Sequence, residues 1–348
     1  NHVHMSTNEG QSWELLSDDL TRNDPEKLVS SGGPITQDNT GVEYYCTIFA
    51  ANESPLKEGL LWVGSDDGLI HVTKDGGSTW ENVTPSNMPE WSMVNSVEPS
   101  NFDEGTCYVA ATRYKLGDFR PYLYKTTDYG KTWTKITTGI NDEHFTRALR
   151  EDPKRKGLLY AGTETGMYIS FNDGQNWESF QLNLPIVPIT DLTIKDNNLV
   201  VATQGRSVWI IDDLTVLHQL DASKKGSSAI LYQPKDSYRT KGTAAKEPSK
   251  TEGQNHPNGV VTHFYLKNKS EKDSISLTYT NMRGDTLANY STFAKEEKKK
   301  LKAKPGGNTH VWNTRGKGAE KLKGMILWWA NLDGAKAVPG SYKVHLNV

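Results

Sequence analysis

The sequence has 348 residues, of which 24% are charged and 9% are aromatic, and its formal net charge is −2. This composition excludes an intrinsically disordered chain, and the length fits two or perhaps three domains, each able to bury a core. The absence of any run of about 18 apolar residues excludes a membrane-spanning helix, and two separated cysteines, Cys46 and Cys107, exclude a disulfide framework and offer no zinc-ligand spacing. We expect no metal and no cofactor.

One short pattern recurs four times within the first 220 residues. Each copy has Ser or Thr, then a turn rich in Asp or Asn with Gly, then a small polar residue and Trp, at 6–13, 73–80, 126–133 and 170–177. An Asp or Asn side chain accepts hydrogen bonds from nearby backbone N–H groups, and Gly takes the left-handed conformation that closes such a turn. Short β-rich runs flank the copies, so each is expected to be a hairpin turn between two strands.

The runs around these turns predict four strands per repeat. The clearest repeat has them at 147–151, 158–162, 167–170 and 177–181, and the last has three, at 190–194, 199–203 and 207–211. Asp212 and Asp213 stand where the turn of the last repeat would be. Four short strands per repeat of 40 to 70 residues is typical of a β-propeller blade. Residues 1–220 are therefore expected to form the C-terminal part of a propeller, about four and a half blades.

The four turns resemble the Asp-box, or bacterial neuraminidase repeat, which occurs in sialidases, in xyloglucan-cleaving glycosidases and in the luminal domain of sortilin. Longer stretches resemble large secreted bacterial proteins of glycosyl-hydrolase or sortilin-like type, at 39–45, 61–68, 150–153 and 201–206. The resemblance covers about residues 1–220 and implies a propeller fold. It also implies that the Asp residues of the boxes lie far from an active site, so Asp75, Asp128 and Asp173 are read as structural.

A second domain follows a segment rich in Lys, Ser, Thr and Gly, so 221–258 are expected to form a linker or long loop. Strands are predicted at 260–266, 274–280, 309–313, 325–330 and 342–347, with a hairpin turn at 282–285. This spacing favours a β-sandwich of immunoglobulin or fibronectin type III character over 259–348. The whole chain is thus predicted to be all-β. Charge divides the same way, because 1–220 hold 17 basic and 31 acidic side chains and 221–348 hold 23 and 11.

Candidate site residues gather on the propeller face opposite the boxes, which the second-to-third-strand loops and the connections between blades would form. Carboxylates beside aromatic rings suit sugars, and glycoside hydrolysis needs two carboxylates about 5–10 Å apart. The candidates for catalysis are Glu43, Asp66, Asp67 and Glu164. The candidates for substrate binding are Tyr44, Tyr45, Trp91, Arg113, Arg120, His144 and Arg206.

Each of these assignments has a structural alternative. Asp66, Asp67 and Glu164 stand beside Gly in tight hairpins, where acids commonly stabilise the turn. One of the two tyrosines also suits core packing, Trp91 suits anchoring of its loop, and Arg206 suits an ion pair with a neighbouring blade. No sialidase-type arginine motif, nucleophile elbow, zinc-protease motif or phosphate-binding loop occurs.

The sequence therefore supports two function classes. The first is a secreted or cell-surface propeller that binds carbohydrate and, if an enzyme, hydrolyses it as a glycosidase does. The second is a non-catalytic, sortilin-like scaffold for a protein or peptide, or a subunit of a cell-surface assembly. The acidic first part argues against nucleic acid as a partner. We expect an extracytoplasmic location, and we expect the chain to be a piece of a longer polypeptide whose preceding blades come before residue 1.

Overall fold

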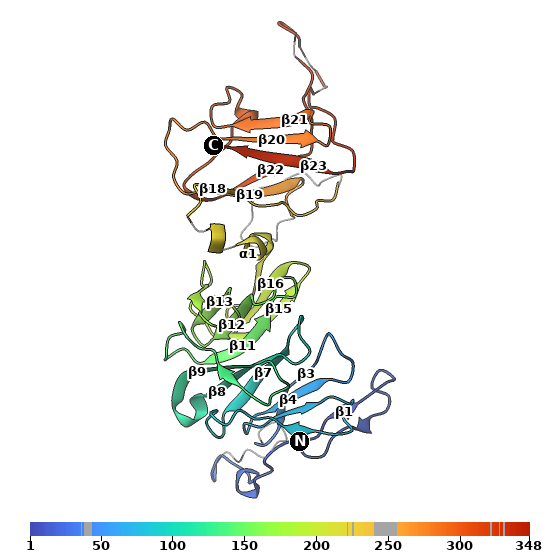
Figure 1. Cartoon of the computed structure of the whole chain (residues 1–348), viewed down its shortest axis with the longest axis vertical. Coiled ribbons are helices and arrows are strands. Elements are labelled where there is room, and N and C mark those ends of the chain that lie inside the picture. The colour runs from blue at the N-terminus through green and yellow to red at the C-terminus, as the bar shows by residue number, and fades with distance from the viewer. Residues whose placement is uncertain are drawn as a thin grey trace. The chain divides into compact units, whose positions relative to one another are not determined.

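The protein is described here by a computed structural model that covers 1–35, 37, 44–220, 222–224, 226–239, 256–320, 322–326, 328–329 and 331–348. The chain divides into two compact units, Asn1–Leu214 (unit 1) and Thr215–Val348 (unit 2). Strands and loops make up nearly all of both units (Figure 1), so the predicted all-β class is confirmed. None of the helices in the described ranges is long and apolar enough to cross a membrane.

Unit 1 is a series of five antiparallel sheets of two, four, four, four and three strands, which matches the predicted four and a half blades. The strands of each sheet are neighbours in chain order, so each sheet is a meander. The first two sheets contain β1 (His4–Met5), β2 (Glu14–Leu15), β3 (Ile48–Glu53), β4 (Leu61–Ser65), β5 (Ile70–Thr73) and β6 (Glu81–Asn82). The third contains β7 (Met93–Pro99), β8 (Cys107–Arg113), β9 (Asp118–Thr126) and β10 (Thr134–Lys135). The last two contain β11 (Thr146–Glu151), β12 (Leu159–Thr163), β13 (Gly166–Ser170), β14 (Glu178–Ser179), β15 (Ile189–Lys195), β16 (Asn198–Thr203) and β17 (Val208–Ile211).

The first strands of the last four sheets share two features. Strands β3, β7, β11 and β15 contact one another in that order (Figure 1), and each has a register shift one or two residues after it begins. Such a bulge bends a strand and increases its twist. A recurring bulge at one position means that the four sheets share one backbone plan, which is what the sequence repeat predicts.

The four repeated turns form the same hydrogen bonds. In the second, the Thr73 hydroxyl donates to Asp75 at 2.8 Å and accepts from the Gly77 N–H at 2.9 Å, and Asp75 accepts from the Thr79 N–H at 2.9 Å. The corresponding bonds recur in the first, third and fourth turns, where Asn8, Asp128 and Asn172 take the place of Asp75. The second, third and fourth turns join the third and fourth strands of their sheets, and the first joins the two strands of the first sheet, so each is a hairpin turn as predicted.

The Trp of a turn connects its blade to the blade before it. The indole N–H of Trp133 donates to the Val83 carbonyl at 2.6 Å, and that of Trp177 donates to the Ile136 carbonyl at 2.7 Å. Trp80 makes the same bond to Leu16 at 3.1 Å. In every case the acceptor directly follows the last strand of the preceding sheet. Hydrophobic clusters continue across these joints, because one cluster includes residues of β4 and β8 and another includes residues of β8 and β12.

Unit 2 contains two three-stranded antiparallel sheets around one hydrophobic cluster. Phe264 and Trp312 come to that cluster from the first sheet, and Leu277 and Tyr279 from the second. The sheets consist of β18 (Ala229–Leu231), β19 (Val260–Leu266) and β22 (Gly306–Trp312), and of β20 (Ser276–Asn281), β21 (Thr286–Ser291) and β23 (Tyr342–Asn347). The predicted turn at 282–285 joins β20 to β21. The immunoglobulin or fibronectin type III character of this unit stays a prediction.

Two features of unit 2 differ from the expectation. The segment 221–258, predicted as a linker, contains β18, which pairs with β19. It also contains the short helix η3 (Ala222–Lys224), and the helix α1 (Thr215–Gln219) precedes it. The strand predicted at 325–330 is wrong, because the described residues of that range are in no strand. Trp328 and Trp329 there are 86% and 98% exposed. An apolar run forms a strand only where a neighbouring strand accepts its backbone hydrogen bonds.

Candidate functional site

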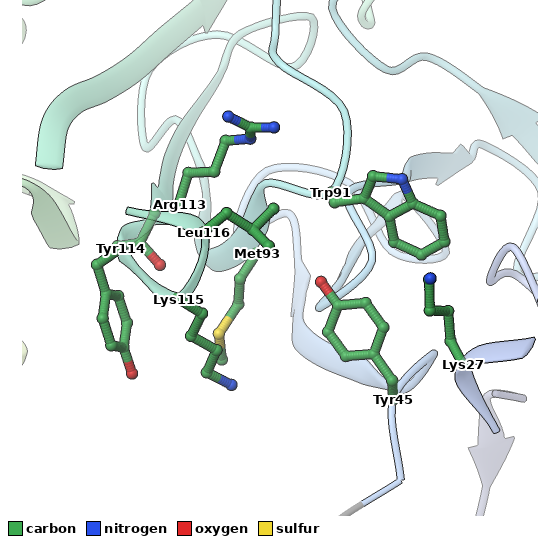
Figure 2. Close-up of a pocket in the computed structure, with 9 residues that line it drawn as sticks. Lys27, Tyr45, Trp91, Met93, Arg113, Tyr114, Lys115 and Leu116 are labelled. Carbon is green, nitrogen blue, oxygen red and sulfur yellow. The ribbon is translucent and has the colours of Figure 1, made fainter. Parts of the chain in front are cut away.

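Unit 1 contains a pocket of about 430 Å³, which we call the site pocket (Figure 2). Its lining comes from three places in the chain. The first is the connection from β2 to β3, which contains the short helix η1 (Pro25–Lys27). The second is the connection into β7 with the start of that strand, and the third is the end of β8 with the helix η2 (Tyr114–Leu116) that follows it. The lining residues are Lys27, Tyr45, Trp91, Met93, Thr112, Arg113, Tyr114, Lys115 and Leu116. The pocket thus lies among the loops from which the sequence predicted a site.

Two aromatic rings form one wall of the site pocket. The rings of Tyr45 and Trp91 are stacked, with centroids 5.7 Å apart and planes at 21°. Two cations face the indole, because the guanidinium of Arg22 lies 4.9 Å from the ring centroid and the ammonium of Lys27 lies 5.8 Å from it. Figure 2 shows the tyrosine ring, the indole and the Lys27 side chain grouped on one side of the pocket. A cation over an indole is attracted by the negative face of the ring.

The opposite wall is carried by the helix η2, which is fixed at both of its ends. Gly117 ends the helix in the left-handed conformation, with φ of 74°, and its N–H donates to the Tyr114 carbonyl at 2.9 Å. Tyr114 stacks on Phe145 of the next blade, with ring centroids 4.9 Å apart. The guanidinium of Arg147 lies over both rings, at 5.4 and 5.1 Å. The loop is therefore held in place by a contact with the neighbouring blade.

Asp66 and Asp67, predicted as catalytic candidates, are buried and hold backbone in place. Asp66 accepts from the Thr47 N–H at 2.7 Å and from the Thr47 hydroxyl at 3.0 Å. Asp67 accepts from the Arg22 N–H at 2.7 Å and from the Ser65 hydroxyl. Burial raises the pKa of the Asp66 carboxyl. Neither residue lines the site pocket, so their observed contacts fit the turn-stabilising alternative, and a catalytic role has no geometric support.

The other two carboxylates have different outcomes. Glu164 accepts from the Arg147 guanidinium at 2.6 Å and does not line the site pocket. Its contact is nevertheless connected to the pocket, because Arg147 in turn covers the ring of Tyr114. Glu43 lies outside the described residues. None of the described residues that line the pocket has a carboxylate side chain.

Three predicted binding residues, Tyr45, Trp91 and Arg113, line the site pocket together. The other four do not. Tyr44 is 39% exposed beside the pocket's Tyr45, and Arg120 forms a two-point contact with Asp118, at 2.9 and 2.7 Å. The Nδ1 atom of His144 lies 2.8 Å from the Tyr168 hydroxyl. Arg206 donates to the carbonyl of its neighbour Gly205 at 3.0 Å.

Several lining residues were not predicted from the sequence. The loop 113–120 was identified for its arginines, but Tyr114, Lys115 and Leu116 within it were not. Lys27 lies in a short helix ahead of the first four-stranded sheet, and no motif of the sequence marks it. Two of these residues, Lys27 and Lys115, carry positive charge in the lining.

The Tyr45 hydroxyl is neutral. Burial, followed by the charges of Asp66 and Asp67, raises the pKa of Tyr45 to about 12, so its hydroxyl stays protonated around pH 7.

The described residues that line the site pocket include no His, Cys, Asp or Glu. Within the described ranges, no cluster of three or more His, Cys, Asp or Glu side chains is placed to hold a metal ion. Cys46 and Cys107 are both buried and free, and burial raises the pKa of the Cys46 thiol to about 11. What the lining offers is an apolar surface, a neutral hydroxyl and three cations, which is a binding surface.

Comparison with known proteins gives partial similarity to propeller proteins. No protein-family model matches the chain. An oligoxyloglucan-reducing end-specific xyloglucanase of Emericella nidulans is 22% identical over 108 residues, which are 31% of this chain and 13% of that protein. A GH74 enzyme of Niastella koreensis is similar in structure with a TM-score of 0.42 and 19% identity, over 60% of this chain and 33% of that one. YCF48 from Cyanidioschyzon merolae is similar in structure with a TM-score of 0.36 and 18% identity, over 48% of this chain and 53% of that one. The chain thus matches only a small part of the length of the xyloglucanase.

Proposed function

We propose that unit 1 is part of an Asp-box β-propeller of an extracytoplasmic protein, and that it binds carbohydrate in the site pocket. The observation that carries this proposal is the stacked pair of Tyr45 and Trp91, 5.7 Å apart, in the wall of a pocket among the loops of consecutive blades. Sugars bind aromatic faces through their C–H groups and direct their hydroxyls to nearby polar groups. Both kinds of surface meet in this lining.

The same pocket supports binding more than hydrolysis. A glycosidase of the common type places two carboxylates about 5–10 Å apart on either side of the bond that it cleaves. The described lining contains none, and Asp66, Asp67 and Glu164 already accept hydrogen bonds from protein groups. The partial similarity to a xyloglucanase supports a carbohydrate ligand, while the chemistry of the described residues supports a binding role for this part of the protein.

The alternative is a pocket for a peptide. One observation favours it, since apart from its charged side chains the lining is mainly apolar and Thr112 is its one residue with an aliphatic hydroxyl. A peptide side chain is recognised by such a surface as readily as a sugar ring. The discriminating measurement is direct binding of both classes of ligand to the same chain.

The test is calorimetric titration of the 348-residue chain with neutral and acidic oligosaccharides, including xyloglucan fragments, and with a set of extended peptides. Trp91→Ala is expected to weaken sugar binding at least tenfold, because an aromatic anchor of a binding site contributes a large part of the affinity. Trp13→Ala is the matched control, because Trp13 is an exposed indole far from the lining in sequence. No binding of any oligosaccharide at millimolar concentration would contradict the proposal, and peptide binding that is lost in Trp91→Ala would establish the alternative.

A further inference from the structure

The charge of the site pocket is opposite to that of the segment around it. Residues 1–220 contain 17 basic and 31 acidic side chains. Among the described residues, the lining of the pocket contains the cations Lys27, Arg113 and Lys115 and no acidic residue. A cationic cavity on an acidic background concentrates anions locally and discriminates against other sites on the same surface. We propose that the ligand of this pocket is an anionic sugar, one that carries a carboxylate or a sulfate. This inference rests on the proposed function and names the class of ligand.

The ion pairing and the positions of the two lysines support this class of ligand. Neither Lys27 nor Lys115 forms an ion pair with any residue in the described part of the chain. They come from different elements, η1 and η2, on the two sides of the pocket. Figure 2 shows the Lys27 ammonium beside the Trp91 ring and the Lys115 side chain on the opposite side, below Met93. A ligand between them would therefore meet positive charge from both sides.

The third cation is held in a fixed orientation. The Nε–H of Arg113 donates to the Glu90 carbonyl at 3.0 Å, and one terminal nitrogen lies 3.8 Å from the Asp118 carboxylate. A guanidinium has five N–H donors, so one bond to a carbonyl leaves others available for a ligand. Because the arginine is already oriented, it loses little side-chain freedom on binding an anion.

Two buried acids near the pocket, Asp66 and Asp67, already accept hydrogen bonds from protein groups. Asp66 is close enough to Lys115 for the lysine to lower the pKa of its carboxyl, although burial has the larger and opposite effect. Both of its oxygens accept hydrogen bonds from Thr47, at 2.7 and 3.0 Å. Asp67 is fully buried and accepts from Arg22 and Ser65. These two acids help burial to raise the pKa of Tyr45, and they are not among the described lining residues.

The aromatic wall fits the same ligand. A uronic acid or a sulfated sugar has an apolar C–H face and one anionic group at the edge of its ring. Tyr45, Trp91, Met93 and Leu116 provide apolar surface, and the cations stand around it. The Tyr45 hydroxyl stays protonated around neutral pH, so it can donate a hydrogen bond to the anion without adding negative charge.

The decisive experiment uses two ligands that differ only in charge. Oligogalacturonate and its methyl ester have the same sugar rings, but only the first is anionic, and a sulfated oligosaccharide forms the third arm. We expect the acid to bind the 348-residue chain at least tenfold more tightly than the ester at 50 mM NaCl. This preference should decrease as salt is raised to 300 mM, since screening weakens attraction between exposed charges. Binding of the sulfated ligand in place of the acid identifies sulfate as the anionic group.

Variants locate the effect. Lys27→Met with Lys115→Met keeps most of the length of both side chains and removes their charge, and it should lower the affinity for the acid at least fivefold more than the affinity for the ester. Lys195→Met is the control, because this lysine is 78% exposed and lies outside the pocket. Thermal unfolding checks that each variant is folded. If neutral sugars bind as tightly as acidic ones and Trp91→Ala abolishes both, the proposed function holds and the anionic ligand is refuted. If no sugar of any charge binds, both proposals fail.

Discussion

The first of the four repeated turns differs from the other three in the exposure of its tryptophan. The difference separates formation of the turn from contact between blades. Its hydrogen bonds are the same as theirs, with the Gly10 N–H donating to Ser6 at 2.7 Å and the Ser12 N–H donating to Asn8 at 3.0 Å. Its tryptophan, however, is 64% exposed, while Trp177 of the fourth turn is 3% exposed. The polar residues alone thus build the turn. The other three Trp side chains are more buried, and each of them donates to a residue at the end of the preceding sheet.

The glycines of the motif show the same contrast. A Cβ atom at Gly130 would lie 2.5 Å from the Cβ of Val83, and one at Gly174 would lie 2.6 Å from the Cδ1 of Ile136. Val83 and Ile136 are the residues whose carbonyls accept the Trp hydrogen bonds. At Gly10 the nearest atom is in Trp13 of the same turn, at 3.6 Å. The glycine and the tryptophan of a turn therefore contact the same aliphatic residue of the preceding blade, and we call this contact the glycine–tryptophan receptor.

The largest expected effect is on the buried tryptophan. Trp177→Ala removes a ring from a hydrophobic cluster and leaves the Ile136 carbonyl without its donor, so it should lower the free energy of unfolding by about 3–5 kcal/mol. Trp13→Ala should change it by no more than about 0.5 kcal/mol, because the side chain is mostly in solvent. Urea unfolding followed by circular dichroism measures both. Equal losses would show that the indole stabilises its own turn and not the joint.

The glycines give a smaller and cleaner comparison. Gly10 and Gly174 both have left-handed backbone, with φ of 83° and 79°, so Ala costs about 1 kcal/mol at either position from conformation alone. Only Gly174→Ala adds a clash with the preceding blade, which should raise its total cost to about 2–4 kcal/mol. Chemical denaturation of the two variants tests this, and a loss at Gly10 as large as that at Gly174 would contradict the receptor described above.

The smallest effect concerns acid stability. Hydrogen bonds from Thr79, first from its hydroxyl and then from its N–H, lower the pKa of Asp75 to about 2, and Thr132 lowers that of Asp128 in the same way. An acid whose pKa is lower in the folded state stabilises the fold above its ordinary pKa, near 3.8, and this stabilisation is lost as pH falls towards 2. Asp75→Asn should therefore flatten the decline in melting temperature between pH 4 and 2. The first and fourth turns have Asn at this position already, so the variant should fold, and an unchanged pH profile would exclude this contribution.

The repeats made the blades of unit 1 predictable, because each combines a local turn with alternating strands and needs no knowledge of distant contacts. The repeats also indicated which loops would lie together, and three residues from those loops, Tyr45, Trp91 and Arg113, line one pocket. Lys27 was not predictable, since it is brought to the indole only by the packing of η1. The roles of Asp66 and Asp67 depend on whether their carboxylates accept hydrogen bonds from backbone N–H groups. Only interatomic distances show this, and a sequence does not contain them. The strand expected at 325–330 shows that an apolar run does not reveal whether a neighbouring strand exists.

The indole hydrogen bond between blades always has its donor in the later blade and its acceptor in the earlier one. The two sides of a blade are consequently different surfaces. One side presents the indole ring and the glycine of the turn, and the other presents a backbone carbonyl and an aliphatic side chain. Such surfaces associate head to tail and do not suit a two-fold dimer, in which a surface must fit itself. Any additional blade that contacts Trp13 must therefore present the end of its fourth strand, whichever polypeptide it belongs to.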